Sequence, residues 1–176
     1  MDNIEIDGIV HDLSHLRRFI VAVPGKGRDN SELRVAIRLR LHTISRSCVA
    51  GEDPNMHDEN GQARVFCEDR YTFSLGLPEI ARRMVEQNYF CWESSDRNRS
   101  MNYAVVDVAP GRIRNLQNGE HYVIFFYLYP SGGTAADVDL HITSCYLRFM
   151  HFDRIKRRYN LHTVLRKCLF DQKRVP

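Results

Sequence analysis

The sequence contains no hydrophobic run long enough to cross a membrane. Its longest apolar run, from Tyr122 to Tyr129, has eight residues, whereas a membrane-spanning helix needs about 20. The first residues, MDNIEIDGIV, begin with acids and lack the basic flank and apolar stretch of a secretory signal. These two absences predict a cytoplasmic protein that does not enter a membrane.

Paired motifs for disulfides or metals are also scarce. The chain has five cysteines but no CxxC pair, and an odd number leaves one thiol over even under full oxidation. Reduced thiols of the cytosolic kind are therefore expected. The eight histidines include no HxH pair, so the sequence predicts no metal site and no cofactor.

What is present fits one globular domain with a charged end. At 176 residues, with 43% apolar and 27% charged residues, the chain can bury a core without metal or disulfide cross-links. The net charge is +3, but residues 151–176 carry eight bases and two acids, which is +6, so residues 1–150 sum to −3. We expect a single α+β domain over 1–150 and a basic helical tail over 151–176 packed on it. The tail favours an anionic partner such as RNA, although a solvated helix face explains the charge equally well.

Residues 120–149 are the most apolar, β-branched and aromatic part of the chain. They are typical of two strands around a Gly-rich turn and are expected to form the middle of a sheet. Further strands are expected at 17–23, at 32–44 and from 101 to 109. A charged turn is expected at 94–100, and Asn118-Gly119 is a hairpin signal before the long pair. The sheet is thus expected to be antiparallel.

One main helix is expected from about Pro78, a residue that suits a first helical position, to about Gln87. The tail reads as one broken or two short helices. Their expected buried residues are Ile155, Tyr159, Val164, Leu165, Leu169 and Phe170. The order of elements predicts an α+β fold, in which an antiparallel meander of four or more strands packs on one main helix and a basic helical tail follows.

The stretch 32–44 alternates between apolar and polar residues. Its polar face carries Arg34, Arg38, Arg40 and His42. Like charges along one strand repel each other, so either an anion or acidic side chains should lie over them. The polar, turn-rich stretch from 45 to 64 is expected to be a long mobile loop.

The histidines and arginines of this region suit phosphodiester chemistry. A metal-independent ribonuclease needs a base for the 2′-OH proton, an acid for the leaving 5′-oxygen and a cation for the phosphorane. Histidine can serve as either proton carrier near neutral pH, and the arginine fork fits phosphate. We therefore consider His42, His57 and Arg64 as candidate catalytic residues and Arg70 as a phosphate contact. A purely structural role, such as an arginine holding a loop against the sheet, explains each of them as well.

The second long strand offers substrate contacts. A period of two places Ser144 and Tyr146 on one face and His141 and Thr143 on the other, and we expect the Ser144/Tyr146 face to contact substrate. A tyrosine on a central strand is also often a core residue with its hydroxyl satisfied at the edge.

The segment His141-Ile142-Thr143 resembles one half of the paired His-x-Thr/Ser signature of the 2H phosphoesterases. Two such strands flank a phosphate in that family. The second half would come from His42-Thr43 or His162-Thr163. In both pairs the threonine comes directly after the histidine, whereas the signature has one residue between them. This resemblance implies a phosphodiesterase that uses His141 and Thr143.

Residues 33–149 resemble a group of uncharacterised proteins from phages and integrated mobile elements. The resemblance is carried by the segments HTISRS, ARVFCEDRYTFSLGLPEIARRMVEQ, NYAVVDV, HYVIFFYLYP and DLHITSCYLRF. More remotely, the early His and Arg, one helix and a sheet that ends in Ser-x-Tyr resemble the barnase–EndoU–colicin–RelE superfamily of toxin ribonucleases. That resemblance implies that His42 with Arg46 or Arg64 is the early catalytic pair, and that Ser144 and Tyr146 contact substrate.

Three functions remain open from the sequence. The first is a cytoplasmic, mobile-element protein that acts on RNA as a metal-independent endoribonuclease of toxin type. The second is a non-enzymatic interaction module, such as an inhibitor of a host defence complex. The third is a 2H-like phosphodiesterase centred on His141 and Thr143.

Overall fold

A seven-stranded sheet forms the centre of the protein. The computed structural model describes residues 2–95, 101–106, 117–155 and 157–175. The strands of the sheet lie in the spatial order β12 (Tyr159–Asn160), β8 (Phe90–Ser95), β9 (Met101–Val106), β10 (Gly119–Pro130), β11 (Val138–Met150), β4 (Leu33–Leu39) and β3 (Phe19–Val23). Strands β8 to β11 form an antiparallel meander, which confirms the α+β fold class expected from the sequence.

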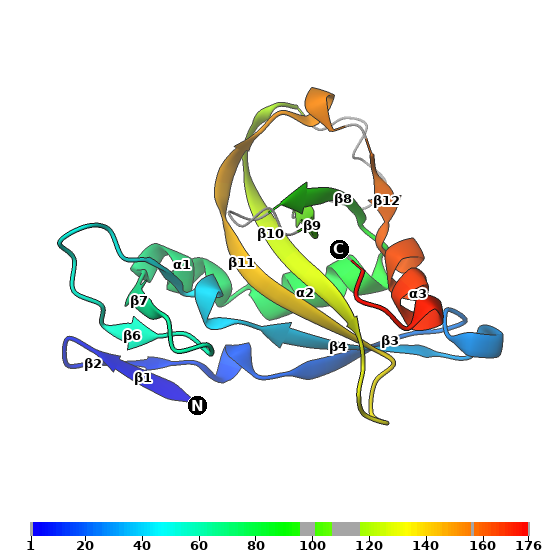
Figure 1. Ribbon diagram of the computed structural model, residues 1–176, viewed down its shortest axis with the longest axis horizontal. Coiled ribbons are helices and arrows are strands. Elements are labelled where there is room, and N and C mark those ends of the chain that lie inside the picture. The colour runs from blue at the N-terminus through cyan, green and yellow to red at the C-terminus, as the bar shows by residue number, and fades with distance from the viewer. Residues whose placement is uncertain (1, 96–100, 107–116, 156, 176) are drawn as a thin grey trace.

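The longest pair in the sheet is the β10–β11 hairpin, which Figure 1 shows as two long strands that curve across the molecule. It confirms the two strands expected within residues 120–149. Strand β11 also pairs with β4, and this pairing is parallel. A parallel pair needs a long crossover, and here the chain between β4 and β11 includes the helices α1 (Glu68–Ser74) and α2 (Leu77–Glu86) as well as β8 to β10.

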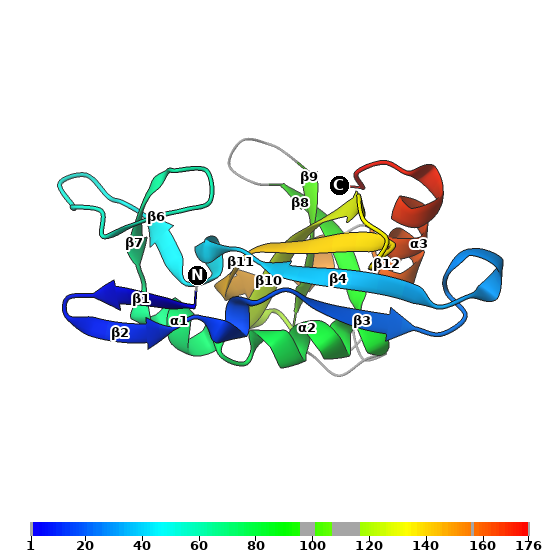
Figure 2. The same cartoon turned by 90° about the horizontal axis from the view of Figure 1, so that it is seen from below.

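The main core lies between one face of the sheet and two helices, α2 (Leu77–Glu86) and α3 (Leu161–Asp171). Phe126 of β10, Met84 of α2 and Leu165 of α3 are fully buried there. Figure 2 shows α2 running along β3, and it shows α3 near the C-terminus, beside β12. The main helix therefore lies where its Pro78 start predicts it.

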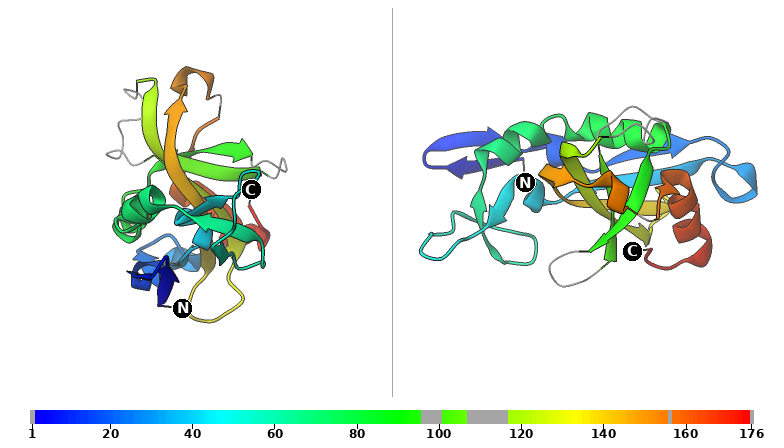
Figure 3. Two further views of the ribbon diagram at one scale, coloured as in Figure 1. Left: turned by 90° about the vertical axis from the view of Figure 1, so that its left-hand side faces the viewer. Right: turned by 90° about the horizontal axis from the view of Figure 1, so that it is seen from above.

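Residues 45–64 are not a structureless loop, contrary to expectation. They contribute β5 (Ser45–Ser47), β6 (Met56–His57) and the start of β7 (Ala63–Phe66), which form a small three-stranded sheet. Its apolar residues pack with those of the β1–β2 hairpin (Asn3–Ile6 and Ile9–Asp12), and the two units lie together at one end of the molecule (Figure 3). The few apolar side chains in this polar stretch give little periodicity, and the small core forms only through contacts distant in sequence.

The strand expected at 32–44 ends earlier, at Leu39. The chain then turns through the 3-10 helix η3 (Leu41–Thr43). The Thr43 hydroxyl donates to the Arg40 carbonyl oxygen at 2.7 Å, and the Leu41 amide donates to Glu59 Oε1 at 2.8 Å. Such local side-chain bonds compete with strand pairing, so His42 lies on a turn and not on the strand. A short helix, α1 (Glu68–Ser74), precedes α2 and was not expected.

The last residues return to the body of the protein. After β11 come the 3-10 helix η5 (Phe152–Arg154), the edge strand β12 and then α3. Val164, Leu165 and Leu169 are buried as expected, but Phe170 is 45% exposed and lies under arginine side chains. Ile155 and Tyr159 are partly buried.

Two sequence expectations fall partly outside the described residues. The charged turn at 94–100 includes 96–100, and the end of the strand expected at 101–109 includes 107–109. Asn118-Gly119 does not form a two-residue hairpin, because β9 ends at Val106 and β10 begins at Gly119. All five cysteines are free thiols. Within the described ranges, no helix has the length and apolar character needed to span a membrane.

We expect Phe126→Ala to lower the free energy of unfolding by roughly 3–5 kcal/mol, because it leaves a cavity in the main core. Phe170→Ala should lower it by about 1 kcal/mol or less, because that ring is largely outside the core. Chemical denaturation of both variants measures the difference. Equal losses would contradict the placement of α3.

Candidate functional site

A small pocket opens on the face of the sheet opposite α2 and α3. Its volume is about 150 Å³, and it is lined by Arg40, His42, Glu59, Asn60, Tyr127, Tyr129, His141 and Thr143. These residues come from four places: the end of β4 with η3, the turn between β6 and β7, β10 and β11. The pocket thus joins the small sheet to the large one.

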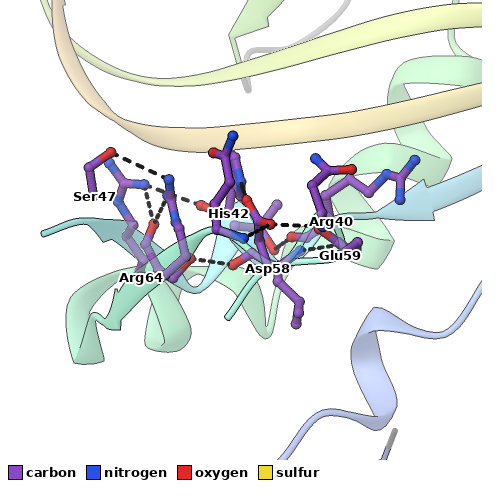
Figure 4. A network of polar contacts seen from close by, with 12 residues as sticks. Arg40, His42, Ser47, Asp58, Glu59 and Arg64 are labelled. Carbon is purple, nitrogen blue, oxygen red and sulfur yellow. Dashed lines mark hydrogen bonds and ion pairs between the residues drawn. The ribbon is translucent and has the colours of Figure 1, made fainter. Parts of the chain in front are cut away.

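His42 is held by a buried carboxylate. Its Nε2 lies 2.7 Å from Asp58 Oδ2, and the other carboxylate oxygen of Asp58 accepts the amides of Asn60 and Gln62 at 2.8 and 3.0 Å (Figure 4). Burial by itself raises the pKa of the Asp58 carboxyl, but these hydrogen bonds outweigh it and lower the pKa below its ordinary value. Asp58 is therefore ionised and fixes the imidazole of His42. The other ring nitrogen of His42, Nδ1, bonds to no described residue.

His141 faces the same pocket in a different environment. Its Nδ1 lies 3.4 Å from Arg40 Nη2, and its ring lies 4.9 Å from that of Tyr129. Burial, together with the charge of Arg40, lowers the pKa of His141 to about 4. Its Nε2 is buried and has no hydrogen-bond partner among the described residues. A neutral imidazole with an unsatisfied nitrogen in a pocket is typical of functional sites.

A β-bulge in β11 sets the direction of these side chains. Residues directly opposite each other in an antiparallel pair present their side chains on the same face. His141 lies opposite Tyr127, whereas Ser144 lies opposite Phe125, so Thr143 is an extra residue without a partner on β10.

The expected separation of His141 from Ser144 and Tyr146 is therefore wrong. The extra residue shifts the alternation by one position, and all three side chains lie on the same face of the sheet. Even so, Ser144 and Tyr146 do not line the pocket. Tyr146 stacks on the Phe125 ring at 5.3 Å and belongs to a second, smaller core.

Arg64, expected to be catalytic, and Arg70, expected to contact phosphate, do not line the pocket. Arg64 is 7% exposed and donates from Nε to Ser45 Oγ and from Nη2 to the Ser45 carbonyl oxygen, both at 3.2 Å. Arg70 donates to the carbonyl oxygens of Ser45 and His42 at 2.5 and 3.2 Å, and its guanidinium lies over the Tyr146 ring. Arg70 thus holds the turn that carries His42, and Arg64 holds Ser45, which follows this turn; Figure 4 shows Arg64 in this network.

The remaining candidates separate. His57 lies outside this pocket and lines a larger one, of about 470 Å³, whose lining also includes Asp58 and Glu59. Of the two possible partners for the His141-Ile142-Thr143 motif, His162 lies on α3 and its Nε2 donates to the Val85 carbonyl oxygen at 2.6 Å. His42 does share the pocket, although the Thr43 hydroxyl faces away from it and is fully buried.

Sequence reasoning missed Arg40, Asp58, Tyr127 and Tyr129 as site residues. Arg40 was placed near His42 by alternation, but nothing in the sequence indicates that it would meet His141, which is 101 positions away. The spacing of the two tyrosines on β10 shows only that they share a strand face.

Metal ligands do not gather at this site. Within the described part of the chain, no group of three or more His, Cys, Asp or Glu side chains could hold a metal ion. His11 and His15 have i,i+4 spacing, but they lie on β2 and on the 3-10 helix η1 (Ser14–Leu16), and both rings contact the Tyr71 ring.

Together these features define an α+β protein with a two-histidine pocket on the open face of its sheet. The chain matches the model of the YjaZ family over residues 3–169 and belongs to that family. No curated protein and no solved structure matches it.

We expect His141 to titrate near pH 4 and Arg40→Gln to raise its pKa, because the guanidinium disfavours a second positive charge beside it. Burial remains in the variant, so the pKa of His141 should stay below 6.5. NMR titration of the imidazole resonances measures both values, with His141→Gln identifying the signal. Titration of His141 near 6.5 in the unaltered protein would contradict this prediction.

The same shift has a consequence for stability. In the unfolded chain His141 binds a proton near its ordinary pKa of about 6.5, before it can do so in the folded protein. The free energy of unfolding should therefore fall as the pH drops from 6.5 to about 4. His15 and His162, whose pKa values are also lowered by burial, add to this fall. Denaturation at several pH values should show a shallower fall for His141→Gln than for the unaltered protein.

Proposed function

We propose that this protein cleaves phosphodiester bonds in RNA without a metal ion, at the pocket shared by His42 and His141. The observation that supports the proposal is the convergence of two differently held histidines and Arg40 on one small cavity. The remote resemblance to toxin ribonucleases motivates RNA as the substrate.

Each residue has a role that follows from its environment. The ionised Asp58 accepts the Nε2–H of His42, so Nδ1 of His42 accepts the proton of the 2′-OH as the 2′-oxygen attacks phosphorus. The bond from phosphorus to the 5′-oxygen then breaks. Because an arginine can only donate, Nδ1 of the neutral His141 accepts from Arg40, and its Nε2 carries the proton that goes to the leaving oxygen. His141 then regains a proton, by way of solvent, from the protonated His42. Arg40 binds the phosphate and stabilises the charge that develops on it. The products are a 2′,3′-cyclic phosphate and a free 5′-hydroxyl.

The size of the pocket fits this reaction. Pockets that enclose whole small molecules measure about 300–1,000 Å³, whereas this one measures about 150 Å³. It suits a phosphate with part of one nucleotide, while the rest of the chain lies outside on the sheet.

A 2H-like phosphodiesterase is a second candidate, because Thr143 lines the same pocket as His42 and His141. In that case the preferred substrate is a small cyclic phosphodiester and not a polymer. Incubation with a 2′,3′-cyclic mononucleotide separates the two. Ring opening without cleavage of an oligoribonucleotide supports the second candidate over the first.

An interaction module is favoured by one observation. Phe73 of α1 stacks on Tyr122, which lies opposite Leu147, and Leu147 and the nearby Phe149 are 46% and 58% exposed. Exposed apolar clusters of this kind mark protein-binding surfaces. A complex that forms with the unaltered protein and with His42→Ala, but not with Phe149→Ser, would support this function.

We expect His42→Ala and His141→Ala each to lower RNA cleavage by about 10²-fold or more, because each removes one proton carrier. The measurement is cleavage of a labelled oligoribonucleotide in EDTA. His57→Ala is the matched control and should keep full activity, since His57 lies outside the pocket. Asp58→Asn should lower activity while the fold remains. Intact RNA in every buffer with the unaltered protein would overturn the proposal.

A further inference from the structure

The open face beside the pocket carries two aromatic rings on β10 and two arginines on β4, with β11 between these strands. From the pocket outward along β10 it presents Tyr127 and Tyr129, which lie opposite His141 and Asp139 of β11. Arg38 of β4 pairs with His141, so the Arg38 side chain lies on the same face as that of His141. The helices α2 and α3 cover the other face of these strands.

The arginines on this face are only loosely paired. Arg38 and Arg18 both lie 3.8 Å from the Asp139 carboxylate, and Arg34 lies 3.7 Å from Asp137. The expected acidic side chains thus lie beside the arginines of β4. The side chains of Arg34 and Arg38 are nevertheless 43% and 46% exposed, and ion pairs this long and this exposed contribute little. Each guanidinium can therefore turn toward a phosphate.

The charges along this face favour an anion. Five arginines, at positions 18, 34, 38, 40 and 174, are accompanied by three acids, at positions 59, 137 and 139. Arg34 and Arg38 are four residues apart on a strand, which is about 13 Å, so their charges form a row and not a single point. A row of this length fits the backbone of a polymer.

The ring faces of the two tyrosines are reachable from outside. The exposed Arg174, in the segment that follows α3, lies with its guanidinium 4.3 Å from the Tyr127 ring centre and 5.7 Å from that of Tyr129. The neighbouring Val175 pairs with Leu128 along the edge of β10 and holds Arg174 there. A flat, charged group thus already stacks where a nucleobase could stack. Base stacking on an aromatic ring is stronger than an exposed cation–π contact, so a base can replace the guanidinium.

We propose that the open face of β10, β11 and β4 binds single-stranded RNA, with bases stacked on Tyr127 and Tyr129 and phosphates on Arg38 and Arg34. This inference rests on the proposed function for the choice of RNA, and it places the strand so that one phosphate enters the two-histidine pocket. Stacking on a side chain requires unpaired bases, so duplex RNA should bind more weakly.

The test uses the complete protein and a labelled oligomer of ten 2′-O-methyl ribonucleotides. The methyl group blocks attack by the 2′-oxygen, so binding is measured separately from cleavage. Fluorescence anisotropy should show that the double variant Tyr127→Leu/Tyr129→Leu loses about tenfold or more in affinity. Tyr127→Phe/Tyr129→Phe should keep it, because stacking needs the ring and not the hydroxyl.

Two further variants make the test specific. Arg38→Gln should weaken binding and reduce the slope of log affinity against log salt by about 1, as expected when one phosphate contact is lost. Phe170→Leu is the matched control, since Phe170 is an exposed ring 5.5 Å from the guanidinium groups of Arg28 and Arg166, on α3 over the other face. It should bind as the unaltered protein does.

Three results would overturn the inference. They are unchanged affinity of the leucine double variant, an equal loss in Phe170→Leu, and duplex RNA that binds as tightly as the single strand. If the oligomer binds and the variants change its affinity as expected, but RNA is not cleaved, only the proposed catalysis is overturned. Normal cleavage with unchanged affinity in the double variant would overturn the binding face alone.

Discussion

Burial of one row of side chains on β10 and β11 is the constraint on which the rest of the structure depends. Ile124, Phe126 and Leu128 of β10 face α2 and α3 with essentially no exposure. Because side chains alternate along a strand, Tyr127 and Tyr129 must then face the other way. The same packing that builds the main core therefore leaves two aromatic rings on the open face, beside the histidine pocket.

The bulge at Thr143 changes which side chains of β11 face the core and which face the open side of the sheet. Without it, the residues of β11 after Thr143 would keep the register of its first half, and Cys145 would leave the core. With it, Cys145 remains 1% exposed and pairs with Ile124, while the polar residues on both sides of the bulge share the open face. Bulges are frequent beside functional sites because they redirect a side chain without ending the strand.

The two histidines of the pocket are prepared in opposite ways. His42 lies on a turn that Asp58 and Arg70 hold by hydrogen bonds to His42 itself, while Arg64 holds Ser45 just after the turn. His141 is fixed by its strand and is kept neutral by burial and by Arg40. Two titratable groups whose surroundings differ in this way are suited to separate acid and base roles. Membership of the YjaZ family does not by itself assign such roles, and the acid and base roles are our proposal from the geometry of this chain.

The sequence by itself determined the elements whose signals are local. The β10–β11 pair, the strand at β3, the helix that begins beside Pro78 and the α+β class follow from runs of β-branched, aromatic or helix-starting residues. It also placed His42 among the candidate residues, since histidine chemistry near neutral pH needs no structure to be recognised.

Only the tertiary structure decided which residues meet. The partners Asp58 and His141 lie 16 and more than 90 positions from His42, the single extra residue of the bulge reverses the expected faces, and the small sheet at 45–66 forms through contacts between weakly apolar segments. Such contacts depend on packing across the whole chain, because no local pattern of residues specifies a pairing between distant segments.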